Sequence, residues 1–196
     1  MTWFKVNFIF HPQQPQTMKI LWTAALCCCW LSASTQQIQA YVSPQTEIHL
    51  WGKIPSQALW ANPYAEWFKK GYDYHQPDTQ LLPALQLVME GCRFQLFLGT
   101  WCGDSKREVP KILKIMSALG CKTQDLDIIA LSNQGNDYKK GPQGEEKDLN
   151  IVRVPSLLVY RNNKALGRII EYPVESWEKD LLKILRGETY TPHYSK

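Results

Sequence analysis

The sequence lacks the residue clusters that mark several common classes of functional site. Its four histidines are scattered and give no metal-ligand spacing with the cysteines: His11, His49, His75 and His193. It has no glycine-rich phosphate loop, no G-x-S-x-G element and no internal repeat. These absences argue against a zinc site, a nucleotide-binding loop, a serine hydrolase and a repeat architecture. We therefore expect neither a bound metal nor a cofactor.

A strong excess of one charge is also missing. The chain has 22 Lys and Arg against 18 Asp and Glu, a net charge of +4. Lys5 and Lys19 precede residue 41 and no acidic residue does, so the remaining 20 basic and 18 acidic residues give only +2. This balance is not that of a nucleic-acid-binding protein. With 44% hydrophobic and 20% charged residues, the composition fits one globular domain.

An apolar run from Ile20 to Ser34 follows Met18-Lys19 and precedes a polar, glutamine-rich stretch. It is shorter than the roughly twenty apolar residues of a membrane span and is typical of a signal peptide, with Met18 as a possible initiator. We expect residues 1–40 to be an N-terminal extension and signal peptide, and residues 41–196 to be a single domain without a stable membrane segment. The domain would be exported, to the periplasm in a bacterium.

Two alternatives to signal cleavage remain. Cys27-Cys28-Cys29 could mark lipid attachment, although the residues before them lack the usual leucine followed by two small residues. The run could also be retained as an N-terminal anchor. Either alternative still places the domain outside the cytoplasm.

Outside that run cysteine is scarce, and Cys92, Cys102 and Cys121 are the three that remain. Cys102 lies between the apolar run 94–98 and the amphipathic run 106–119, where a strand is expected to lead into a helix. The partial positive charge of a helix N-terminus stabilises a thiolate, the form of cysteine that attacks disulfides. Cys102 is therefore the candidate nucleophile.

The motif Trp101-Cys102-Gly103-Asp104-Ser105-Lys106, followed by Pro110 and then by Val154-Pro155-Ser156, resembles the thioredoxin superfamily from about Ile48 to Leu185. The resemblance implies an α/β thioredoxin-like fold, a central mixed β-sheet flanked by helices. It also implies that Trp101, Gly103 and Val154 contact the substrate, and that Pro155 follows a cis peptide bond that exposes the backbone of Val154.

The motif departs from the superfamily at two positions. Ser105 stands where the second cysteine is usual, and Asp104 stands where proline is usual. A serine cannot supply the second sulfur of a dithiol, so we do not expect ordinary thioredoxin reductant chemistry. Ser105 as a hydroxyl donor, Lys106 and the helix dipole favour the thiolate, whereas an ionised Asp104 disfavours it. Asp104 could transfer a proton or simply stabilise the first turn of the helix.

Neither remaining cysteine can resolve a mixed disulfide on Cys102, because each lies roughly 25 to 30 Å away along a strand or a helix. The thioredoxin topology would instead bring Cys92 and Cys121 together at the opposite pole of the domain. They could form a structural disulfide there or remain as two buried thiols.

The remaining elements follow from periodicity and turn residues. Aromatic residues between 55 and 71 have mostly helical spacing and are expected in the core, and Arg107 and Glu108 are expected to be solvated. Residues 41–46 are expected to be flexible, 132–144 to be a polar loop and 189–196 to be frayed. We expect strands at 47–52, 93–98, 126–131, 156–160 and 165–171, and helices at 78–90, 105–119, 145–149 and 177–186.

Two functions fit these observations. In the first, the chain is a monothiol thiol-disulfide oxidoreductase or isomerase that acts through Cys102 on protein or glutathione disulfides. In the second, it is a redox-inactive module that binds a peptide or protein in the groove between Trp101 and Pro155.

Overall fold

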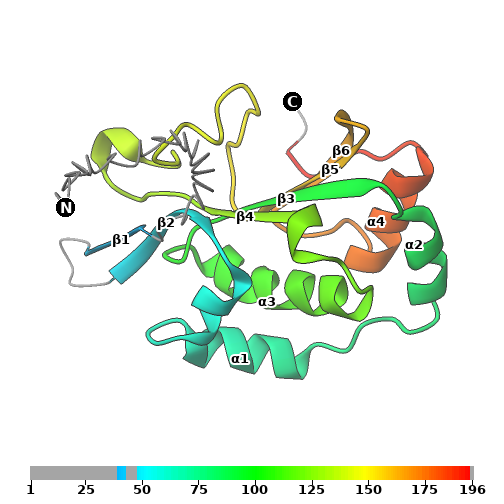
Figure 1. Cartoon of the computed structure of the whole chain (residues 1–196), viewed down its shortest axis with the longest axis horizontal. Helices are drawn as coiled ribbons and strands as arrows, with labels where there is room; N and C mark the ends of the chain where they lie inside the picture. Colours follow the sequence, from blue (N-terminus) through cyan, green and yellow to red (C-terminus); the bar gives the residue numbers. More distant parts are fainter. Residues whose placement is uncertain (1–38, 43–47, 195–196) are drawn as a thin grey trace, which may run out of the picture. The chain divides into compact units, whose positions relative to one another are not determined.

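The computed structural model describes residues 39–42 and 48–194, which form a mixed β-sheet with helices packed against it (Figure 1). The strand order is β1-β2-β4-β3-β5-β6; β3 and β4 are parallel and the other neighbours are antiparallel. The order from β2 to β6 is that of the thioredoxin fold, so the predicted fold class is confirmed. The strands are β1 Gln39–Val42, β2 Ile48–Ile54, β3 Cys92–Leu98, β4 Leu126–Ala130, β5 Ser156–Arg161 and β6 Lys164–Ile170.

Alternate residues of the central strands fill two separate cores. In β3, Phe94, Leu96 and Leu98 belong to the larger core, whereas Phe97 points to the smaller one on the other face. The same alternation holds along β4 and β5. Because successive side chains of a strand point to opposite faces, a sheet covered on both sides reads as a nearly continuous apolar run. This explains the run 94–98.

The four α-helices cover one face of the sheet and contribute their buried residues to the larger core (Figure 1). Gly71 of α1 packs against Pro110 of α3 so closely that an added Cβ would lie 2.9 Å from Pro110 Cγ. The α-helices are α1 Ala65–Tyr74, α2 Leu82–Val88, α3 Gly103–Ala118 and α4 Trp177–Arg186, and the 3₁₀ turns are Ser56–Trp60, Thr123–Asp125 and Gly135–Asp137.

The opposite face is covered by the segment 132–155, in which the predicted helix at 145–149 does not form. The carboxylates of Glu145 and Glu146 accept backbone N–H groups of Gln143 and Gly141, and Asp148 has a positive φ of 61°. Side chains that bind nearby backbone in this way favour turns over a helix. This face is therefore lined by an irregular segment rather than by a helix.

The structure also differs from the sequence-based predictions near β1 and in the aromatic stretch 55–71. Strand β1 pairs with β2 where flexible chain was predicted, and it crosses the boundary predicted between residues 40 and 41; the rest of that segment, 43–47, lies outside the described residues. The aromatic stretch 55–71 is divided by the cis peptide bond before Pro63. Phe68 is fully buried in the core as predicted, whereas Trp60 packs against it at the rim and is 44% exposed.

The prediction of a frayed C-terminal tail is wrong for the described part of that tail. Tyr190 donates a hydrogen bond of 2.9 Å to Asp180, and the Tyr194 hydroxyl lies 3.4 Å from that of Tyr172. Aromatic anchors therefore hold the chain after α4. Within 39–42 and 48–194, no helix is long and apolar enough to span a membrane. The predicted signal peptide and the cysteines 27–29 lie outside the described residues.

Candidate functional site

Cys102 is the N-cap residue of α3, immediately after the turn that follows β3. Its backbone is extended, with φ −88° and ψ 127°, and its carbonyl accepts the first helical hydrogen bond from Lys106 N at 3.0 Å. Its own N–H donates to Gly99 O at 2.9 Å, which closes the turn. The predicted placement of the thiol at the start of a helix is thus confirmed, and the free N–H groups of the first turn lie beside it.

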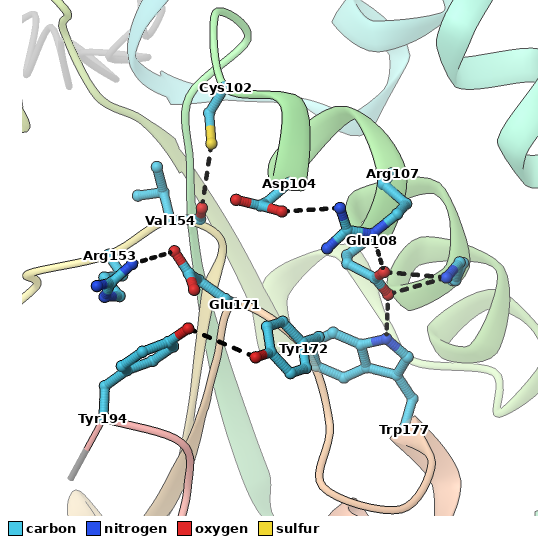
Figure 2. Close-up of polar contacts among 11 residues, drawn as sticks. Cys102, Asp104, Arg107, Glu108, Arg153, Val154, Glu171, Tyr172, Trp177 and Tyr194 are labelled. Carbon is cyan, nitrogen blue, oxygen red and sulfur yellow. Dashed lines mark hydrogen bonds and ion pairs between the residues drawn. The ribbon is translucent and has the colours of Figure 1, made fainter.

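The second half of the motif lies directly against this thiol. The Val154–Pro155 peptide bond is cis, as the resemblance implied. Cys102 Sγ donates a hydrogen bond of 3.3 Å to the Val154 carbonyl (Figure 2). Pro155 O in turn accepts the N–H of Glu171 at 2.7 Å, which ties the loop to the end of β6. Two segments about fifty residues apart in the sequence are therefore in contact at the sulfur.

Ser105 has a different role from the one predicted. Its side chain is fully buried, and its oxygen accepts the Gly99 N–H at 3.2 Å rather than donating to Cys102. It holds the turn that carries the nucleophile. Gly103, by contrast, is exposed, and an added Cβ there would meet nothing within 4 Å, so the approach to Cys102 on that side is open.

Trp101 turns toward the segment 132–142. Its indole N–H donates to Leu131 O at 2.8 Å, and its ring centroid lies 5.5 Å from that of Tyr138. Gly99 makes room for the indole, because a Cβ there would lie 2.6 Å from the ring. Trp101 remains half-buried, so it forms a fixed wall next to Cys102. Tyr138, which is 51% exposed, extends this wall.

Charges on α3 are arranged in pairs. The Asp104 carboxylate accepts from Arg107 Nη1 at 2.8 Å, so this first-turn acid is neutralised by its own helix (Figure 2). Arg107 is half exposed, as expected, whereas Glu108 is 4% exposed. The prediction that Glu108 is solvated is wrong, because this carboxylate accepts hydrogen bonds from Trp177, Lys111 and Arg107. Burial alone would raise its pKa, but those three donors lower it below the ordinary value.

Sequence reasoning missed a second charged pair, on the other side of the sulfur. Arg153 Nη1 lies 3.0 Å from Glu171 Oε1, and its guanidinium carbon is 3.8 Å from the centroid of the Tyr194 ring. Glu171 has a positive φ of 59°, unusual for a residue with a side chain. Figure 2 shows this pair beside Val154. The available signal was the position of Arg153, which immediately precedes the Val-Pro-Ser motif.

Cys92 and Cys121 both lie at the far end of the sheet from Cys102, and they line one cleft there. In the structure both are free thiols, which corresponds to the second of the two alternatives left open by the sequence. Cys92 Sγ contacts Val88 O, whereas Cys121 Sγ contacts Lys122 O. Burial, together with Asp125, raises the pKa of Cys121 to about 11. In this structure they are two separate, partly or fully buried thiols.

The described residues contain no group of three or more His, Cys, Asp and Glu side chains that could hold a metal ion. The reactive group that the geometry brings to the site is a single thiol at a helix N-terminus. Around it are the cis-proline backbone, an aromatic wall and two neutralised charge pairs. Trp101, Gly103, Val154 and Pro155 lie near Cys102, and their predicted contact with a substrate stays a prediction, whereas Ser105 lies behind the turn.

No protein-family model and no curated protein matches the sequence. Among solved structures, a protein of unknown function from Pseudomonas aeruginosa is 17% identical, covering 63% of this chain and 81% of its own, with a TM-score of 0.41. An HIV epitope scaffold is 18% identical, with coverage of 64% and 83% and a TM-score of 0.40. A complex of ferredoxin:thioredoxin reductase with thioredoxin f2 is 22% identical, with coverage of 57% and 89% and a TM-score of 0.32.

Proposed function

We propose that this chain is an exported monothiol thiol-disulfide oxidoreductase or isomerase whose nucleophile is Cys102. The observation that carries the proposal is the placement of Cys102 as the N-cap residue of α3, beside the cis peptide bond between Val154 and Pro155. Helix N-termini are where reactive cysteines commonly lie in proteins, and the exposed Gly103 leaves one side of Cys102 open to a partner. Because residue 105 is a serine and not a cysteine, Cys102 has no second thiol in the motif.

The exchange takes two steps. Cys102 loses its proton to solvent, and the thiolate attacks one sulfur of a protein or glutathione disulfide. A Cys102–substrate disulfide forms while the substrate S–S bond breaks, and the second substrate sulfur leaves as a thiolate. Another thiolate then attacks the substrate sulfur of the mixed disulfide and releases Cys102. If that thiolate belongs to the substrate, the disulfide is isomerised with no net oxidation; if it is an external thiol, the external thiol is oxidised.

One observation favours the alternative of a redox-inactive binding module. The hydrogen bond from Cys102 Sγ to Val154 O requires the protonated thiol, and it must break before the thiolate can attack. A chain bound between Trp101 and Pro155 would use the same surface without any chemistry. In that case Cys102 would be a contact residue only.

The test is the release of glutathione from a peptide mixed disulfide, with glutathione as the external thiol. We expect the wild type and Cys121→Ser to accelerate release equally, and Cys102→Ser to give only the uncatalysed rate. Acceleration that persists in Cys102→Ser would overturn the proposal. Binding of the peptide by the wild type without any acceleration would support the binding module instead.

A further inference from the structure

A cavity of about 600 Å³ lies next to the site, on the face of the sheet that is covered by the segment 132–155 rather than by the α-helices of the described residues. Three segments enclose it: strands β5 and β6, residues 150–152 of the covering segment, and the C-terminal residues 190–194. We call it the tail groove. Its volume is in the range of ligand-binding clefts. Its lining includes Val152, Leu158, Tyr160, Arg168, Ile170, Tyr190 and Tyr194.

The C-terminal residues 190–194, which form one wall of the tail groove, are held by side-chain contacts. Tyr190 is hydrogen-bonded to Asp180 on α4, and Tyr194 is held between Tyr172 and the guanidinium of Arg153. In each of these contacts a tyrosine of the C-terminal segment binds a residue that precedes that segment in the chain. The tail is therefore held beside the groove rather than inside it, and the cavity between tail and sheet is part of the fold.

The tail groove continues directly from the site. Val152 and Ile170 line it, and the residues that follow them, Arg153 and Glu171, form the ion pair beside the cis peptide (Figure 2). The next residue after Arg153 is Val154, whose carbonyl contacts the Cys102 sulfur. An extended chain that crosses Cys102 would reach the groove within about two or three residues, at roughly 3.3 Å per residue.

The residues that line the tail groove indicate which class of ligand it would bind. Most of its lining residues are aliphatic or tyrosine, with Leu158, Tyr160 and Ile170 on the strands; Asn150 is also polar, and Arg168 is its one charged residue. That guanidinium is already hydrogen-bonded to the carbonyls of Leu149 and Asn150. Strand β6, which lies at the edge of the described sheet, lines it with consecutive residues from Ala165 to Arg168. Apolar walls beside a sheet edge suit an extended polypeptide better than a small anionic thiol.

We propose that the tail groove binds the apolar, extended polypeptide segment next to the reacting disulfide, so that the substrates are unfolded or misfolded proteins rather than glutathione disulfide. This inference rests on the proposed function for the reaction itself. Binding in the groove can nevertheless be measured without any exchange chemistry.

The experiment uses the full chain carrying Cys102→Ser, and a fluorescent synthetic peptide with a leucine-rich segment beside a glutathione-blocked cysteine. Anisotropy gives the Kd. Adding Val152→Asp places a charge on the groove wall and is expected to weaken binding by about tenfold. Adding Leu87→Asp is the control, because Leu87 is an exposed apolar residue of α2 (81% exposed) outside the groove lining, and it should leave the Kd unchanged. Tyr194→Ser, on the opposite wall, should weaken binding in the same direction.

Unchanged affinity in both Val152→Asp and Tyr194→Ser, with melting temperatures that confirm folding, would overturn the proposal. Equal affinity for a peptide with serines in place of the leucines would also overturn it, as would tighter binding of glutathione disulfide than of the apolar peptide. Because the protein in these binding measurements carries Cys102→Ser and cannot perform the exchange reaction, a failure of the exchange assay and a failure of the groove proposal are separate results.

Discussion

The indole nitrogen of Trp177 lies 2.9 Å from Oε2 of Glu108, and both side chains are almost fully buried. The bond joins the first residue of α4 to α3, the helix whose N-cap residue is Cys102. Lys111 and Arg107 also donate to this carboxylate, so a buried charge is held by three donors. Such a network stabilises the fold only while the carboxyl group is ionised.

Acid should therefore weaken the fold through Glu108. The folded-state pKa lies below the ordinary value of 4.5, since the three donors outweigh the effect of burial. A carboxyl with a lowered folded pKa contributes stability above about pH 4.5 and loses it as the pH falls through the folded value. Urea unfolding below pH 5 should show a steeper loss for the wild type than for Glu108→Gln. Parallel curves for the two proteins would refute this role.

His75 should produce a separate pH dependence at higher pH. Burial lowers the pKa of its imidazole from 6.5, Lys111 and Lys114 act in the same direction, and Glu178 and Glu108 partly oppose the shift. The unfolded chain therefore binds the proton more tightly, and stability falls as the pH drops below about 6.5. His75→Gln should flatten the wild-type decline measured by urea unfolding from pH 7 to 5.5. An unaltered slope in the variant would contradict the assignment.

Gly99 should tolerate no side chain, whereas Gly103 should. A Cβ on Gly99 would lie 2.6 Å from the Trp101 indole and would displace it from Leu131 O, whereas nothing lies within 4 Å of a Cβ on Gly103. We expect Gly99→Ala to lower the free energy of unfolding by about 1 to 3 kcal/mol. Gly103→Ala, in the first turn of α3, should be neutral or slightly stabilising. Equal losses in the two variants would show that the wall next to Cys102 is not tightly packed.

Replacing Ser105 with cysteine should change the step that releases the substrate from its mixed disulfide with Cys102. Residues three apart in the first turn of a helix lie on the same face, so a thiol at position 105 is placed to attack a mixed disulfide on Cys102. In the wild type, release of substrate should increase in proportion to the external thiol concentration. In Ser105→Cys this dependence should disappear for the release step in single-turnover measurements. If it persists, the buried position of residue 105 keeps the second sulfur away from the first.

Much of the fold could be predicted because its signals are local. The central strands carry mostly apolar runs, such as residues 94–98 of β3, and the turn from β3 to α3 is marked by Trp101 and Cys102. The absence of a helix at 145–149 could not be predicted, because it depends on carboxylates of Glu145 and Glu146 binding backbone that precedes them. The docked tail depends on pairs far apart in the sequence, such as Tyr194 with Arg153.

The site, like the fold, could be predicted where its residues stand in local sequence motifs. Cys102 and Pro155 stand in recognisable motifs, and the structure brings them together. The roles of Ser105 and Glu108 could not be inferred, since both residue types are normally exposed and only tertiary packing buries them. Arg153 and Glu171 form their pair because β6 ends in a turn that reaches back to the cis proline, which neither segment alone indicates.

The central claim is that Cys102 is the reactive thiol of this chain. The most direct test is alkylation of the folded protein with iodoacetamide at pH 7, followed by mass spectrometric mapping of Cys92, Cys102 and Cys121. Among these three, we expect Cys102 to be modified first, because Cys92 is buried and the Cys121 pKa of about 11 leaves almost no thiolate at that pH. Modification of Cys102 no faster than Cys121 would contradict the account.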